Sequence, residues 1–316
     1  MTLTPMQSKR GSALITALFI MTMVAIIATA MSSRLQLDIH RTHLIQRSDR
    51  MYLASQAVTF WAIDRLSQPK LSFVAHDPSG QVLVFPKTLQ TIYPNMRIEG
   101  ELIDLQSKFN LNNVSERAYL PIFYGLLERL FPHLYSQERK SILDATTNWV
   151  NGKVDDSLTH NEWFERYSKQ NPVYFPGYQF MQHVSEFRTV FGIDAKRYTT
   201  LLPFITALPE PTLININTAP KAILMSLGDG LSSLDADAII KIRQNDAIDE
   251  FGRIHFFMTK YNIPQQTITL SSHYFLSIAR VYIDDIVFTN YTVIKRYEGR
   301  RGKLVLSVLS ESFNTR

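Results

Sequence analysis

The apolar and polar positions first form one long helical pattern. Gly11–Ser33 carries no charged side chain, and a helix of about 20 apolar residues can cross a bilayer. The ten residues before it hold two charged side chains, Lys9 and Arg10, which favour a cytoplasmic start. Apolar residues then recur every three to four positions, and residues 12–68 contain no Gly or Pro. The pattern predicts one helix ending before Pro69, half in the bilayer and half packed as a stem on a globular head.

The rest of the chain changes from strand patterns to helix patterns and back. Segments rich in Val, Ile, Tyr and Phe, one of them clearly alternating, predict strands at residues 81–85, 97–104, 274–283, 287–296 and 304–309. Helical patterns predict helices at residues 119–130, 136–150, 181–191, 217–227 and 234–243. This order predicts an α+β fold in which an all-α insertion divides a sheet.

A glycine lies between the N-terminal charges and the apolar stretch, at Arg10-Gly11-Ser12. Secretory signal peptides are cleaved after their apolar region, whereas a site here would leave the helix on the mature protein. The arrangement resembles the leader of type IV pilins and type II secretion pseudopilins, in which a membrane peptidase cuts after the Gly and methylates the new amino terminus. The resemblance implies processing between Gly11 and Ser12. Two alternatives stay open: a plain single-pass anchor, and a signal peptide cut after Ala30.

Further features resemble the K branch of the minor pseudopilins. The family usually has Glu at the fifth mature position, and the K branch lacks it; here that position is Thr16. Without the Glu, a subunit has no pairing to make with a neighbour's amine, which suits the first subunit of a fibre. Four segments match the branch in order, although Ser107 replaces a usual Gly. They are 101–113 (ELIDLQSKFNLNN), 201–209 (LLPFITALP), 213–220 (LININTAP) and 271–276 (SSHYFL).

The resemblance implies a pilin-like long helix packed on an antiparallel sheet, with a large all-α insertion. The expected divisions are a leader (1–11), a transmembrane helix (12–33), the stem and first strands (34–109), the insertion (110–265) and the last strands (266–316). It implies a minor pseudopilin at the tip of the type II secretion pseudopilus, needed for export across the outer membrane. The chain would be single-pass in the inner membrane, with its C-terminal domain in the periplasm. Expected partners are minor pseudopilins I and J, other pseudopilins of the fibre, the prepilin peptidase and the inner-membrane assembly platform.

Asparagines in two of these segments predict local structure. Asn215, Asn217 and Thr218 precede a predicted helix, and short polar side chains at such positions accept hydrogen bonds from free amides of the first turn. Asn110, with the two asparagines that follow Leu111, is expected to close a strand-to-helix junction in the same way. These residues are therefore predicted to be structural rather than ligand-binding.

K pseudopilins also resemble one another in an acidic loop that binds calcium. This chain offers Asp155, Asp156, Glu162 and Asn151 as candidate ligands, but two expected Asp positions are Asn. Ca²⁺ prefers six to eight oxygens, several of them from carboxylates. The substitutions predict weaker binding, and a solvated polar loop is the alternative. No cofactor is expected to be required.

An alternative function is a membrane-anchored helix-hairpin-helix protein of DNA uptake, because the INTA segment is followed by a Gly-containing turn at 227–231. Residues 213–263 hold five cations and six anions, whereas DNA binding needs cations facing phosphates. No nucleic-acid partner is therefore expected. The chain has no Cys, which excludes disulfides and thiolate metal sites, and its formal charge is +5. It contains none of the GxSxG, P-loop, HExxH or GxGxxG motifs, so no enzymatic function is predicted.

Overall fold

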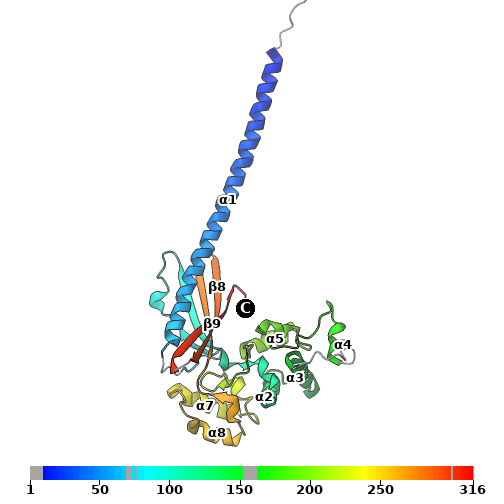
Figure 1. Ribbon diagram of the computed structural model, residues 1–316, viewed down its shortest axis with the longest axis vertical. Helices are drawn as coiled ribbons and strands as arrows, with labels where there is room; N and C mark the ends of the chain where they lie inside the picture. The colour runs from blue at the N-terminus through cyan, green and yellow to red at the C-terminus, as the bar shows by residue number, and fades with distance from the viewer. Residues whose placement is uncertain (1–9, 69–72, 76, 152–161, 300–301, 316) are drawn as a thin grey trace, which may run out of the picture. The chain divides into compact units, whose positions relative to one another are not determined.

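The structure is a computed structural model that describes residues 10–68, 73–75, 77–151, 162–299 and 302–315, with side chains from residue 13 onward. The chain divides into two compact units, Met1–Leu53 and Ala54–Arg316. Helix α1 (Arg10–Leu66) confirms the long helix predicted over 12–68 (Figure 1). Its described part from Ala13 includes an 18-residue window of mean hydropathy 2.4, so α1 is long and apolar enough to cross a membrane.

The second unit contains a five-stranded antiparallel sheet in the order β1-β2-β7-β8-β9. Its strands are β1 (Gln81–Val84), β2 (Arg97–Asp104), β7 (Tyr274–Ile283), β8 (Ile286–Glu298) and β9 (Leu304–Phe313). All five were predicted from the sequence, and β2 and β7 have the predicted bounds. Strands β2 and β7 pair along the whole of β2, up to Asp104 opposite Phe275. The insertion therefore begins and ends at one end of the sheet.

The last turns of α1, from Ala54, cover one face of this sheet. Ala62 and Leu66 pack with Leu102, Phe275 and Ile294 in one buried cluster. Burying such apolar side chains contributes about 1.5–3 kcal/mol each for the larger ones, so this face fixes the helix on the sheet.

Two contacts set how closely α1 lies on the strands. A Cβ at Gly100 of β2 would be 2.4 Å from Val58 Cγ1, so the helix approaches a strand position that only Gly allows. Arg296 of β8 donates through Nε to Leu66 O at 2.9 Å and through Nη2 to Gln68 O at 3.1 Å. A guanidinium at this place satisfies the last free carbonyls of the helix.

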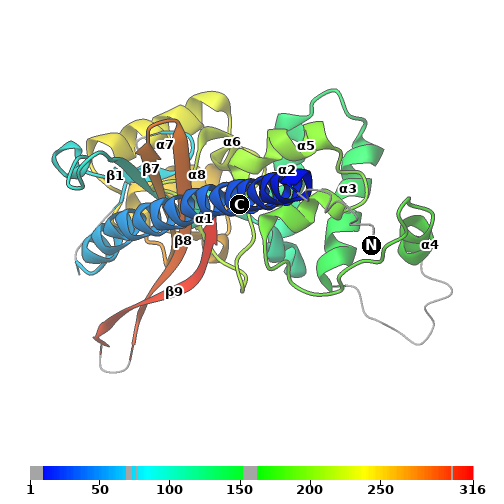
Figure 2. The ribbon, with the colours of Figure 1, turned by 90° about the horizontal axis from the view of Figure 1, so that it is seen from above.

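The segment between β2 and β7 is mainly helical, as predicted, and has its own core. Its helices are α2 (Leu120–Leu130), α3 (Ser136–Asn151), α4 (Glu162–Ser168), α5 (Ala195–Leu201), α6 (Lys221–Leu224), α7 (Ser233–Asn245) and α8 (His255–Lys260). Figure 2 shows α7 and α8 in one group and α2, α3 and α5 in another, and α6 contacts both α2 and α7. Phe123 and Leu126 of α2 are fully buried in the core. The insertion also contacts the second face of the sheet, where Leu208 packs with Leu276.

Several details of this segment differ from the sequence prediction. The chain leaves the sheet after Asp104 and rejoins it at Tyr274, outside the predicted limits of 110 and 265. The helix expected over 181–191 is instead a 3-10 turn, Val184–Thr189. Two short parallel strand pairs are also present: β3 (Phe109–Asn110) with β4 (Ile205–Thr206), and β5 (Ile214–Asn215) with β6 (Ile268–Thr269). Two-residue strands are too short to leave a periodic signal in the sequence.

Candidate functional site: the polar junction between the sheet and the insertion

The four segments singled out in the sequence meet where the insertion joins the sheet. We call the buried polar side chains at this place the polar junction. Its members come from residues 101–113, from 213–220 and from 271–276, while residues 201–209 supply backbone groups. The side chains are those of Asp104, Gln106, Asn110, Asn112, Asn113, Asn215, Asn217, Thr218 and Ser272, and all are almost completely buried.

Asp104, the last residue of β2, is the centre of the polar junction. Its Oδ2 accepts hydrogen bonds from Thr218 Oγ1 at 2.5 Å, Ser272 Oγ at 2.7 Å and Asn215 Nδ2 at 2.9 Å. Its Oδ1 accepts from the Gln106 backbone N–H at 2.8 Å. Burial raises the pKa of Asp104 above the usual value, although each of these hydrogen bonds acts in the opposite direction. One carboxylate thus connects the segment that leaves the sheet after β2, the segment that returns to it before β7, and the LININTAP segment.

Three asparagines bind the backbone of distant segments through pairs of hydrogen bonds. Asn112 accepts from Met181 N at 2.8 Å and donates to Met181 O at 3.0 Å. Asn113 has the same relation to Thr212, with distances of 2.8 and 2.7 Å. Asn217 accepts from Ile248 N and donates to Ile248 O, both at 2.8 Å.

A side-chain amide placed in this way satisfies both backbone groups of one residue, as a neighbouring strand would. Buried backbone groups need such partners, because an unpaired one costs as much as a lost hydrogen bond. The polar junction therefore holds irregular segments where no sheet reaches them.

The predicted capping is correct for Asn110, and Asn215 closes the turn after β5 in the same way, with its Oδ1 accepting from Asn217 N at 3.0 Å. Asn110 Oδ1 accepts from Asn112 N at 3.2 Å and caps the following 3-10 turn. The prediction is wrong for Asn217 and Thr218, because α6 begins after Pro220 without a side-chain cap. Both side chains are fully buried. Asn217 donates to Ile248 O and Leu270 O, and Thr218 donates mainly to Asp104, with a longer contact to Asn215 O. The sequence did contain one signal for the site, an aspartate directly after the apolar pair Leu102-Ile103 at the end of the alternating strand pattern.

The chemistry of the polar junction is that of a structural connection. Its carboxylate is surrounded by donors, and its side-chain amides bind backbone groups or, for Asn215, the side chains of Asp104 and Ser272 in the same chain. Within the described ranges there is no group of three or more His, Asp or Glu side chains that could hold a metal ion. The arrangement fixes the insertion on the sheet and offers no open position to a substrate.

The predicted calcium ligands are only partly placed by the structure. Asn151 ends α3 and is exposed, and Glu162 begins α4, where it forms an ion pair with Arg166. Asp155 and Asp156 lie outside the described residues. One observation fits an oxygen-binding cation: Asn148 Oδ1 is buried and has no hydrogen-bond partner among the described residues. Asn148 lines a surface hollow together with Asp144, Thr147 and Asn151. Amide and carboxylate oxygens are the ligands that Ca²⁺ prefers. The calcium site stays a prediction.

The N-terminal predictions fall on α1. Gly11 and Ser12 lie in its first turn, and their side chains are outside the described part of the chain. Thr16 Oγ1 donates to Ala13 O of the same helix at 3.0 Å. A hydroxyl bonded within its own helix can be buried in lipid without a charged partner, unlike the Glu usual at this position.

Four of the five cations in the helical hairpin that suggested DNA binding are bound within the chain, and the fifth, Lys241, is exposed. The turn of this hairpin between α6 and α7 contains Gly228 and Gly230 at φ 56° and 90°. Lys221 and Lys260 form ion pairs of 2.6 Å with carboxylates of α7, those of Asp237 and Asp235 respectively.

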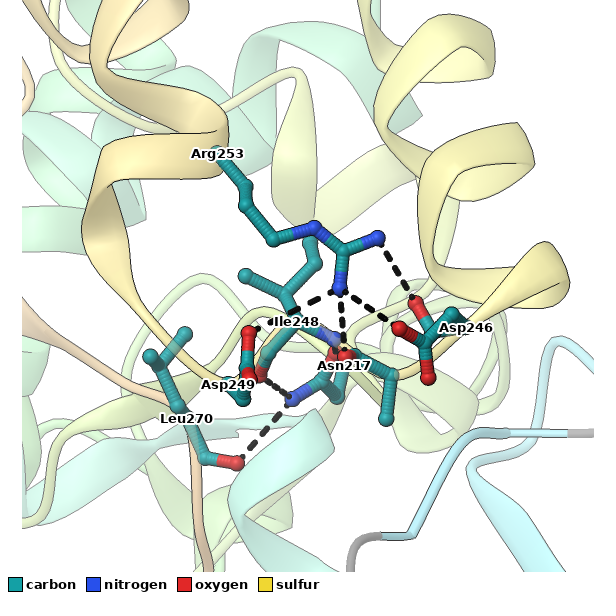
Figure 3. A network of polar contacts seen from close by, with 7 residues as sticks. Asn217, Asp246, Ile248, Asp249, Arg253 and Leu270 are labelled. Carbon is teal, nitrogen blue, oxygen red and sulfur yellow. Dashed lines mark hydrogen bonds and ion pairs between the residues drawn. The ribbon is translucent and has the colours of Figure 1, made fainter.

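The two arginines of this region are also bound within the chain. Arg243 is buried and donates to Ile216 O and Ala219 O at 2.6 and 2.7 Å. Figure 3 shows Arg253 between Asp246 and Asp249, at 3.3 and 3.7 Å from their carboxylates. Phosphates would have to displace these contacts, so the geometry disfavours DNA binding.

Comparison with known proteins agrees with this architecture. A long apolar helix, an antiparallel sheet beneath its last turns and a helical insertion between two adjacent strands define a pilin-like protein. Family models described as type II secretion system protein K match residues 107–210 and 214–260. The chain belongs to the family of type II secretion system protein K.

Curated relatives carry the same description. The protein K of Aeromonas hydrophila is 28% identical over 228 residues, and that of Klebsiella pneumoniae is 30% identical over 223 residues. Each match covers 66% of this chain and 66% of the relative. The protein K of Pseudomonas aeruginosa is 23% identical over 316 residues, which covers 94% of this chain and 91% of the relative.

A solved structure shares the fold. It is a chain in the crystal structure of the GspK–GspI–GspJ complex from the type 2 secretion system of enterotoxigenic Escherichia coli. The similarity has a TM-score of 0.64 at 21% identity, and covers 87% of this chain and 100% of that chain. At this identity the likeness supports the fold itself.

Proposed function

We propose that this protein is a minor pseudopilin at the tip of the type II secretion pseudopilus, needed for export across the outer membrane. Its role would be structural rather than enzymatic. Membership of the protein K family carries the proposal, and the related complex contains GspI and GspJ beside GspK. We therefore propose minor pseudopilins I and J as its partners, joined through their long helices. The other pseudopilins would follow it in the fibre, and the inner-membrane assembly platform would be a further partner.

The place of the insertion supports a position at the tip. Arg296 lies where α1 ends, because it binds Leu66 O, and its N–H donates to His273 O next to the start of β7. The insertion thus joins the sheet at the end where α1 finishes. In a fibre built on parallel helices, this is the end at which the next subunit would have to stack. A helical insertion there, together with Thr16 in place of the usual Glu, favours the first position in the fibre.

The proposed membrane arrangement follows from α1. The prepilin peptidase would cut between Gly11 and Ser12, and the apolar half of the helix would anchor the chain in the inner membrane. The second unit would lie in the periplasm. N-terminal sequencing and mass measurement of protein from membranes test this step. A start at Ser12 with one added methyl group supports it, whereas a start at Met31 or Met1 contradicts it.

Complementation tests the function itself. The full chain is expressed in cells lacking their own protein K, and exported protein is measured in the medium. The variant removes residues 105–274 and joins Asp104 to Phe275 by Asn-Gly, because these two residues are paired and such a turn closes a hairpin. We expect the variant to be processed and to co-purify with minor pseudopilins I and J, but to export nothing. Normal export by this variant would contradict the tip function.

A further inference from the structure

Strand β9 forms an open edge of the sheet. It is the last strand in the sheet order and pairs with β8 alone among the described strands. Gly299 N donates to Lys303 O, and Asn314 N donates to Thr289 O, both at 2.8 Å. Bonded and non-bonded pairs alternate along an antiparallel ladder. Counted from these two bonds, the backbone groups that point away from β8 are those of Leu304, Leu306, Val308, Glu311 and Phe313.

This edge lacks most of the features that usually prevent an edge strand from pairing with another chain. Native edge strands carry Lys, Pro or inward-pointing charges that prevent pairing with another chain. Strand β9 has one charged residue, Glu311, and its carboxylate accepts from Gln56 Nε2 and Asn290 Nδ2 at 2.7 and 2.6 Å. The charge is therefore held on the α1 side and does not face an approaching strand. A bulge at Leu309 is the one irregularity of the pairing.

A groove of about 380 Å³ runs beside β9 on the face that carries the insertion. Leu276, Tyr291, Val293 and Leu309 line it from the sheet, and Val184 and Leu208 line it from the insertion. The bulge places Leu309 in this lining, although 42% of its surface remains exposed. The groove is thus mainly apolar, with Gln182, His183 and Thr206 also in its lining, and it lies along the unpaired backbone groups of β9.

We propose that an extended segment of a partner protein adds to β9 as a sixth strand and places alternate apolar side chains in this groove. A row of backbone donors and acceptors is matched by another extended backbone, and the adjoining groove selects the side chains that alternate toward it. The proposal rests on the edge of β9 and the adjoining groove, which lie within one compact unit, Ala54–Arg316, and not on a position in a fibre.

Photo-crosslinking in cells that contain the complete secretion system tests the proposal. Benzoylphenylalanine is placed at Ser310 or Ser312, which both line the groove, and the crosslinked residues are identified by mass spectrometry. Val308→Pro removes a backbone N–H that points outward, and so leaves the β8 ladder intact.

Val84→Pro is the matched control on the opposite edge strand, β1. Phe85 N donates to Gly100 O at 2.7 Å, so the N–H of Val84 also points outward. The two valines are similarly exposed, at 55% for Val84 and 48% for Val308.

We expect crosslinks from Ser310 and Ser312 to fall two residues apart in one segment of another protein. Their yield should drop about tenfold or more in Val308→Pro, because one hydrogen bond is lost and the approach is blocked, and should stay unchanged in Val84→Pro. Absence of crosslinks, crosslinks to a second copy of this chain or to a helix, or equal yields in both Pro variants would overturn the proposal. If Val308→Pro does not accumulate, Leu309→Asp replaces it, with the same expected loss.

Discussion

Asn217→Asp tests the polar junction with almost no change in side-chain volume. Asn217 Nδ2 donates to Ile248 O at 2.8 Å and to Leu270 O at 3.0 Å, while Oδ1 accepts from Ile248 N at 2.8 Å (Figure 3). An aspartate keeps the acceptor. The second carboxylate oxygen, however, replaces Nδ2, so the carbonyl oxygens of Ile248 and Leu270 lose their donor.

The size of the effect follows from these contacts. Each buried carbonyl left without a donor costs about 1–3 kcal/mol, and the two together give a loss of roughly 2–6 kcal/mol in the free energy of unfolding. That is a large part of the 5–15 kcal/mol, roughly, that stabilises most domains. At a urea dependence of about 2–3 kcal/mol per M, the unfolding midpoint should fall by about 1–3 M.

Urea unfolding of the full-length protein in detergent measures this loss, with the fluorescence of Trp149 and Trp163 reporting on the insertion. Asn95→Asp, which introduces the same charge at an exposed loop position, is the control. The deficit of Asn217→Asp should shrink as the pH falls toward about 4, because a protonated carboxyl can again donate to one carbonyl. Equal midpoints for the two variants at neutral pH would refute the role given to Asn217.

Three further outcomes are expected. Gly100→Ala should lower the free energy of unfolding by about 1–3 kcal/mol through its clash with Val58, and Val58→Ala in the same chain should restore most of it; absence of rescue would place the strain elsewhere. Burial raises the pKa of Asp104 above its value in the unfolded chain, so the fold disfavours the ionised form. The stabilisation of the fold by protonated Asp104 is therefore complete below about pH 4 and is lost as the pH rises through the folded-state pKa. The stability of the wild type relative to Asp104→Asn should therefore fall with rising pH, and a rise would contradict this assignment. Chelated protein should melt at a higher temperature after Ca²⁺ is added, and less so in Asp155→Asn; no shift in the wild type would rule out the calcium site.

The sequence by itself determined the elements whose signal is local. The charge-free stretch and the absence of Gly and Pro produce α1, and strands β2 and β7 begin and end where the apolar pattern does. The short helices α4, α5 and α8 were not predicted, because six or seven residues hold too few turns for periodicity to appear.

Only the tertiary structure decided what the polar side chains of the sequence motifs do. A local pattern can indicate that Asn217 and Thr218 lie near a helix start, and capping is then the nearest available partner. Their partners, Ile248 and Asp104, are distant in sequence, and no periodicity encodes which backbone group will be left without a hydrogen bond. Burial determines these hydrogen-bond partners, because each buried polar group must bond to a group that the fold places beside it. The same holds for the edge of β9, where the neighbouring groove exists only once the insertion has folded onto the sheet.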